Sequence, residues 1–331
     1  MTAYSKLAIA ANSILRWFGL QIIKTDTLED LYSNQDSMQG IDVSENKSSA
    51  VQHQNNSEIA ALINRIQALE ESQPEESVKN IVNYMMRAHW RTIDFFESIS
   101  PLNERLNCPI CGCANNNDFK VLTSESIFNG GKLSRYKCSD CGVIFGPTKM
   151  LSLDPSMLDL EYRNLYRIYS EGDTTESTIR TFHLLNPCKD GIYLDFGCGG
   201  EWSKAISDLR SQGWNIYGFE PSALNSSAFV FSTWEEVQNH RFDGIISHNV
   251  LEHIIDPVDT NTQLASLLKD GGTIVHATPC FEYLYEFSHL HVFFFTGNSA
   301  NILADRSGMK ITNWTRDNEF IACSMSRIGD A

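Results

Sequence analysis

The stretch Leu194-Asp195-Phe196-Gly197-Cys198-Gly199-Gly200 determines the fold of this chain of 331 residues. Two apolar residues precede it, and the segment 201–206 that follows has the composition of a helix. A buried strand is therefore predicted to end in a carboxylate, turn on glycines and enter a helix. A backbone without Cβ lets a ligand approach such a turn and the helix N-terminus closely. An ordinary strand-to-helix connection would use the same residues, so the turn alone does not establish a ligand site.

A second predicted strand strengthens the case for a ligand. Residues 214–219 are mostly apolar and lead directly into Glu220. In a Rossmann-like fold, the acidic residue at the end of the second strand accepts hydrogen bonds from ribose hydroxyls. The two strands together predict a nucleoside-binding edge with Asp195 and Glu220 side by side.

Further motifs follow at the spacing of a known family. The Asp-x-Gly-Cys-Gly run at 195–199 resembles the first motif of class I S-adenosylmethionine-dependent methyltransferases. Residues 242–257 resemble the fourth-strand motif of that family, and residues 267–274 resemble its turn into the fifth strand. This resemblance implies an α/β, Rossmann-like, seven-stranded methyltransferase domain over 191–331, with S-adenosylmethionine as its cofactor.

The family resemblance also implies which residues hold the cofactor. Asp195, Gly197 and Gly199 are expected at its methionine end, and Glu220 at its ribose. The remaining expected contacts are those with adenine and those near the transferred methyl group, namely Ser232 and Thr233 for adenine and His248 and Asn249 for the methyl group.

Two departures from the family pattern affect this cofactor site. Glu201 stands where the family has a third glycine, and the short segment between Glu220 and Phe231 predicts that the third helix is reduced or missing. Both departures concern the adenine contact rather than the fold. They also leave open a non-catalytic scaffold with an empty cofactor site.

Two histidines are candidates for the catalytic base, because an imidazole titrates near working pH. His253 lies in the fourth-strand motif, and His291 lies in a loop rich in polar aromatic residues that would suit a sugar-binding lid. The first could instead orient the backbone, and the loop could merely cover the site. Glu282 is an alternative base in the same loop.

Two cysteine motifs precede the methyltransferase segment. Cys108 and Cys111, and Cys138 and Cys141, form C-x-x-C pairs that are each followed by glycine. Two such knuckles supply four thiolates for a tetrahedral structural site, for which zinc is the default metal. Cys113 is a spare thiol that could substitute as a ligand. A redox role is the weaker alternative, because reactive pairs usually occur singly.

Overall charge limits the function classes. The net charge is −15 and the sequence pI is about 5.0, which argues against a large nucleic-acid footprint. The paired cysteines, without a recognisable leader peptide, predict a cytoplasmic protein that could also lie peripherally on the inner membrane surface.

The chain divides into six predicted segments: an amphipathic N-terminal helix (1–32), a flexible linker (33–57), a helical extension (58–100), a zinc ribbon (101–150), a helical lead-in (151–190) and the methyltransferase domain (191–331). The first helix is predicted to dock on protein, with a membrane surface as the alternative. The ribbon is expected to stand apart from the domain. The strands of the domain are expected to begin near Ile192, Trp214, Ala228, Phe242 and Thr273, followed by an antiparallel hairpin of 311–315 and 320–325.

A ribbon followed by a tyrosine-bearing helix and this cofactor motif resembles a bacterial methyltransferase subgroup that often acts on sugars. The resemblance implies methyl transfer to a sugar, a nucleotide-linked sugar or a glycan. An RNA methyltransferase that grips RNA through the ribbon is the alternative enzyme.

Overall fold

The computed structural model describes residues 75–99, 106–114, 119–166, 169, 172–200, 203–223 and 227–329. These residues lie in one compact unit, Glu75–Ala331. The predicted N-terminal helix, the linker and residues 58–74 of the helical extension lie outside the described residues. Glu201 also lies outside them.

A seven-stranded sheet forms the centre of the methyltransferase segment. Its strands are β4 (Ile192–Phe196), β5 (Asn215–Phe219), β6 (Val230–Phe231), β7 (Phe242–His248), β8 (Leu268–Ala277), β10 (Met309–Asp317) and β11 (Phe320–Arg327). Their order is β10-β11-β8-β7-β4-β5-β6, in which only β11 runs antiparallel to its neighbours. The α/β Rossmann-like fold and the terminal hairpin predicted from the sequence are confirmed.

One strand begins earlier than predicted. β8 starts at Leu268 rather than near Thr273. Leu268 pairs with Phe242, and the next pair joins Thr273 to Gly244, so the intervening residues bulge out of the ladder. Gly271, with φ of +73°, makes this excursion possible without ending the strand.

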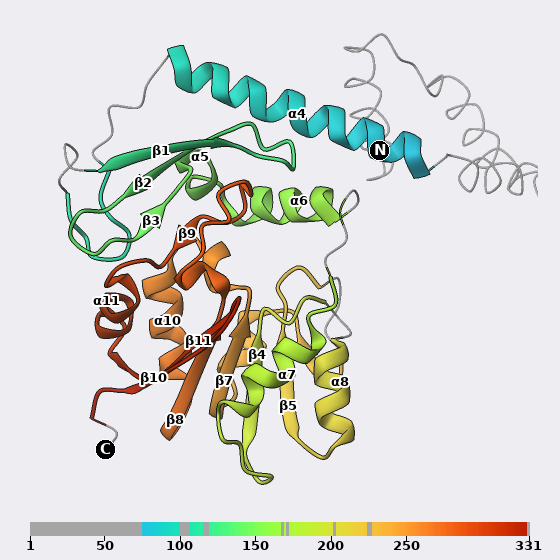
Figure 1. Cartoon of the computed structure of the whole chain (residues 1–331). Helices are drawn as coiled ribbons and strands as arrows, with labels where there is room; N and C mark the ends of the chain where they lie inside the picture. Colours follow the sequence, from blue (N-terminus) through green and yellow to red (C-terminus); the bar gives the residue numbers. More distant parts are fainter. Residues whose placement is uncertain are drawn as a thin grey trace, which may run out of the picture. The chain divides into compact units, whose positions relative to one another are not determined.

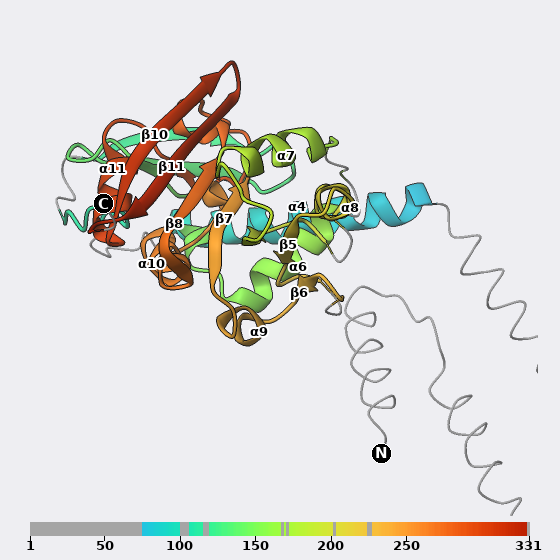
Figure 2. The ribbon, with the colours of Figure 1, turned by 90° about the horizontal axis from the view of Figure 1, so that it is seen from below.

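Helices cover both faces of this sheet (Figure 2). α7 (Thr175–His183) and α8 (Lys204–Ser211) lie on one face, and α9 (Trp234–Gln238) and α10 (Pro257–Ser266) lie on the other. α11 (Ser299–Arg306) packs beside α10 and β10. Because both faces are covered, the central strands are apolar throughout, and Ile245 and Ile246 of β7 are fully buried although they point to opposite faces.

A second, four-stranded sheet is built from the ribbon and one distant strand. It consists of β1 (Lys120–Glu125), β2 (Lys132–Lys137), β3 (Ile144–Phe145) and β9 (Phe293–Phe294), in that order. Phe293 and Phe294 pair antiparallel with Phe145 and Ile144. The expectation that the ribbon stands apart is therefore wrong: the ribbon leaves the edge of β3 open, and an apolar run from the methyltransferase segment completes it and buries its phenylalanines.

Three further helices pack around the ribbon (Figure 1). α4 (Glu75–Ile99) crosses the β1–β2 hairpin, α5 (Thr148–Leu151) follows β3, and α6 (Pro155–Tyr166) runs beneath α4. Trp90 of α4 is fully buried, and its indole nitrogen donates a hydrogen bond to Glu161 of α6 at 3.1 Å. The described part of the predicted helical extension (58–100) is thus a helix, and it is tied to α6 beside the ribbon.

The 3-10 turns η2 (Leu251–His253) and η3 (Pro279–Phe281) follow β7 and β8. They lie at the carboxyl ends of these strands. From this edge of the large sheet the chain continues to β9, which pairs with the ribbon (Figure 1). None of the helices in the described ranges is long and apolar enough to cross a membrane.

Candidate functional site

The turn after β4 forms an open backbone cradle. The amides of Gly197 and Cys198 both donate to the carbonyl of Phe219 at the end of β5, at 2.8 and 3.2 Å. Gly199 and Gly200 have φ of +82° and +150°, and a Cβ on either would meet no atom within 4 Å. The turn therefore needs glycine for its backbone conformation and presents its backbone to open space, as a cofactor site requires.

Two carboxylates border this cradle. Glu220 accepts a hydrogen bond from the Gly199 amide at 3.0 Å through Oε2, and from the Ser222 amide and hydroxyl through Oε1. Asp195 is almost fully buried in β4, where burial and the neighbouring Glu220 raise its pKa to about 7. Close acidic groups at the ends of two adjacent strands favour a ligand that brings hydroxyl donors and a positive charge.

The predicted adenine contacts have structural roles of their own. Thr233 caps the N-terminus of α9, accepting a hydrogen bond from Glu236, whose carboxylate in turn accepts from the Ser232 and Thr233 amides. This capping box keeps the two residues at the end of β6, adjacent to the β5 edge. Their contact with adenine stays a prediction. As expected, no helix occurs among the described residues between β5 and β6.

The two residues predicted to face the methyl group lie at the carboxyl end of β7: His248 is its last residue and Asn249 follows it. His248 is largely buried, which lowers its pKa to about 4, and its Nδ1 lies 3.4 Å from the hydroxyl of Thr178 in α7. Asn249 has φ of +54° and donates its amide to Ala277 of β8. His248 is therefore neutral at working pH, and Asn249 turns the chain away from the strand.

The structure brings together the two candidate bases. The imidazole rings of His253 and His291 lie 4.8 Å apart between centroids. His253 donates from Nδ1 to the carbonyl of Leu290 at 3.0 Å, which leaves Nε2 with the lone pair in the neutral ring. Burial, His253 and Arg135 lower the pKa of His291 to about 2, so its ring stays neutral. The neutral ring of His291 thus lies against that of His253, whose Nδ1 is held by the Leu290 carbonyl.

Aromatic side chains surround this pair. The ring of Tyr162, on α6, lies 6.0 Å from that of His253, and the ring of Tyr285 lies 6.1 Å from that of His291. Glu282, the alternative base, instead pairs with Arg316 of β10. Two histidines, one from η2 and one from the loop before β9, thus pack with two tyrosines in one aromatic cluster, whereas Glu282 is paired elsewhere.

Sequence reasoning missed Arg135. It lies on β2, is 1% exposed, and contacts the loop that carries His291. Leu133 and Arg135 are two residues apart and therefore lie on the same, buried face of β2. This alternation was the available signal, but an arginine would ordinarily be assigned to the exposed face of a strand. The sequence also indicated no role for Glu252, which is buried. Its Oε1 accepts a hydrogen bond from the Thr278 hydroxyl, and its backbone carbonyl accepts one from the Val292 amide.

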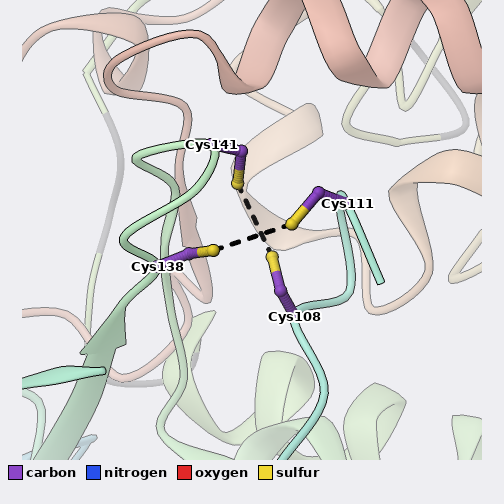
Figure 3. A group of neighbouring side chains, drawn as sticks. All are labelled: Cys108, Cys111, Cys138 and Cys141. Atoms are coloured by element: carbon purple, nitrogen blue, oxygen red, sulfur yellow. Dashed lines mark hydrogen bonds between the residues drawn. The ribbon is translucent and has the colours of Figure 1, made fainter. Parts of the chain in front are cut away.

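The four predicted metal ligands converge (Figure 3). The sulfur atoms of Cys108 and Cys141 lie 3.6 Å apart, as do those of Cys111 and Cys138, and all four lie within 4.8 Å of one another. The two knuckles have the same backbone pattern, in which Gly112 and Gly142 donate to the carbonyls of the first cysteines. The sulfur of Cys113 is not in this group.

Comparison with known proteins agrees with the site. Residues 175–325, a little under half of the chain, match a family model described as a methyltransferase domain. This match assigns a methyltransferase domain to the segment that contains the open cradle after β4. No curated protein matches the chain in sequence.

Two solved structures are similar to parts of the chain. One is the 1,6-didemethyltoxoflavin-N1-methyltransferase of Burkholderia thailandensis with bound 1,6-didemethyltoxoflavin and S-adenosylhomocysteine, at 12% identity over 59% of this chain and 95% of that one, with a TM-score of 0.41. The other is the CcbJ methyltransferase of Streptomyces caelestis, at 12% identity over 50% and 95%, with a TM-score of 0.35. These likenesses are too distant to say what this chain methylates.

Proposed function

We propose that the protein transfers a methyl group from S-adenosylmethionine to a sugar, nucleotide-linked sugar or glycan, and that His253 takes the proton that leaves the acceptor. The paired rings of His253 and His291 carry this proposal. The cofactor supplies the activated methyl group, so the chain needs only to align the acceptor and accept a proton.

The two histidines divide the work. The bond from Nδ1 of His253 to the Leu290 carbonyl turns the basic Nε2 away from that carbonyl and holds the ring in one orientation. His291, with a pKa near 2, is a poor base, and its neutral ring instead packs against His253 and Tyr285. The rings of Tyr162 and Tyr285 flank the pair, and aromatic side chains of this kind suit packing against a sugar ring.

The cofactor half of the proposal has a direct test. Calorimetry with S-adenosylhomocysteine should show binding to the wild type and binding at least tenfold weaker to Glu220→Ala, because the carboxylate that faces the ribose diol is lost. Glu235→Ala is the matched control, since Glu235 is an exposed acid on α9. No heat with the wild type would contradict the proposal.

The acceptor half needs a screen. Transfer of a radiolabelled methyl group should be measured against nucleotide sugars, glycan fractions and RNA from the source organism. Label in a sugar-containing fraction supports the proposal. Label in RNA alone, with an affinity that falls steeply with salt, would favour the RNA alternative. The absence of label in every fraction, despite cofactor binding, would favour the scaffold alternative.

We also propose that the cysteine cluster holds one structural Zn²⁺. A tetrahedral site with Zn–S bonds of about 2.3 Å separates its sulfurs by about 3.8 Å, close to the 3.6 Å separations here. Purified protein should contain one zinc per chain, and Cys138→Ser should lower both the zinc content and the melting temperature. Cys188→Ser, at an exposed thiol, is the control. Full zinc content in Cys138→Ser would contradict this assignment.

A further inference from the structure

A buried arginine of the ribbon grips the loop that carries His291. Arg135 of β2 donates from Nη1 to the carbonyl of Glu286 at 2.7 Å. Its Nη2 donates to the carbonyls of Ser288 and His291, the latter at 3.2 Å. One guanidinium therefore binds three carbonyls within residues 282–292, the loop between η3 and β9.

Other ribbon residues hold the same loop. The hydroxyl of Ser124 donates to the carbonyl of Glu286 at 2.7 Å, and the amide of Ile127 donates to that of Phe287 at 3.1 Å. At the far end, the amide of Gly146 donates to the carbonyl of Val292. Residues 286–292 of the loop are thus attached to β1, to β2, to the turn between them and to Gly146 just after β3, and Arg135 makes three of these bonds.

Arginine is suited to this position by its chemistry. The loop between η3 and β9 has no strand or helix to satisfy its carbonyls, and buried carbonyls need donors. A guanidinium offers five donors in a rigid plane, whereas a lysine ammonium is a point charge that cannot span the same set. No described carboxylate lies within ion-pair distance of Arg135, so the carbonyls, the Phe294 ring 5.3 Å away and the more distant charge of Glu286 stabilise its charge.

The grip reaches both histidines. The Arg135 bond to the His291 carbonyl fixes the backbone from which that imidazole projects. Between Ser288 and His291, both held by Arg135, lies Leu290, whose carbonyl accepts the Nδ1 proton of His253. A more mobile loop would therefore displace His291. It would also weaken the hydrogen bond to the Leu290 carbonyl that keeps the proton of His253 on Nδ1.

We propose that Arg135 is a positioning residue of the acceptor site, which makes the ribbon a structural part of that site. Arg135 acts through the backbone of the 282–292 loop and does not touch the acceptor. This inference rests on the proposed roles of His253 and His291, but its first test needs no acceptor.

The variant Arg135→Lys keeps the charge and loses the planar fork. Hydrogen exchange should be at least tenfold faster for amides of residues 282–292 and unchanged for β4. Imidazole NMR should show the His291 titration rising toward its ordinary range. Arg306→Lys is the matched control, because Arg306 also donates to a ribbon carbonyl, that of Ile110 at 2.6 Å, but does not contact the loop. S-adenosylhomocysteine affinity should stay within twofold in both variants.

With an acceptor in hand, Arg135→Lys should lower kcat at least tenfold, and Arg306→Lys should not. Unchanged exchange and an unchanged His291 titration in Arg135→Lys would overturn the inference, as would faster exchange spread equally over β4. Should Arg135→Lys fail to fold, Ser124→Ala removes one bond to the same loop and must raise exchange in residues 282–292 alone. If exchange in residues 282–292 is faster in Arg135→Lys but the cofactor and acceptor assays fail, the proposed function is contradicted, whereas the role of Arg135 in holding the loop is not.

Discussion

The cofactor edge and the acceptor side of this molecule are built in different ways. The cradle comes from consecutive strand ends, β4, β5 and β6, and its contacts join residues that are near in sequence, such as Gly199 and Glu220. The proposed acceptor side joins α6, β2, η2 and the 282–292 loop, and the bond between Arg135 and His291 joins residues that are 156 positions apart in the sequence. Local construction makes the first site recognisable, whereas the second exists only in the folded chain.

The two sides also differ in the titration of their buried groups. Burial raises the pKa of Asp195 to about 7 on the cofactor edge and lowers that of His291 to about 2 on the acceptor side. Both shifts favour the neutral form, but they have opposite consequences for stability as the pH changes. The two halves can therefore be distinguished by pH as well as by ligand.

The largest expected effect separates the two sites in catalysis. His253→Ala should lower turnover by roughly a hundredfold or more, about 3 kcal/mol in activation free energy, because the proton acceptor is lost. Its affinity for S-adenosylhomocysteine should equal that of the wild type, as measured by calorimetry. Comparable loss of both properties would show that the two sites are not separable.

The next effect concerns acid stability on the acceptor side. The pKa of His291 is lower in the folded chain than in the unfolded chain, so stability is lost as the pH falls and the unfolded state takes up the proton. This group should lower the free energy of unfolding by roughly 2 to 3 kcal/mol between pH 7 and pH 4. Urea titrations at both pH values should show a smaller drop in His291→Gln. An identical drop would mean that His291 is exposed to solvent in the folded protein.

The smallest effect concerns the cofactor edge and has the opposite sign. The pKa of Asp195 is higher in the folded chain, so its contribution to stability is present at low pH and is lost as the pH rises toward 7. The loss should be about 2 kcal/mol between pH 5 and pH 8. Asp195→Asn should flatten this dependence in urea titrations without cofactor. A slope equal to that of the wild type would place the charge of Asp195 in contact with water.

The sequence predicted the turn after β4 and the strands beside it, because their signals are local. The glycines at 197, 199 and 200 need positive φ values that few other residues adopt, and each C-x-x-C-Gly knuckle forms its own turn. The positions of most strands along the chain followed from the family resemblance and from apolar runs of strand length. His253 and His291 were predicted as two separate candidate bases, and the contact between their rings was not predicted.

The sequence by itself therefore determined the strand segments of the large sheet, the turn beside Asp195 and the two cysteine knuckles. Only the tertiary structure decided that Phe293 and Phe294 complete the ribbon sheet, that Arg135 turns inward and that the Leu290 carbonyl sets the tautomer of His253. The physical reason is range. A turn or knuckle is specified by the conformational limits of neighbouring residues, whereas an open strand edge, an unsatisfied carbonyl or a buried charge finds its partner only when distant segments pack together.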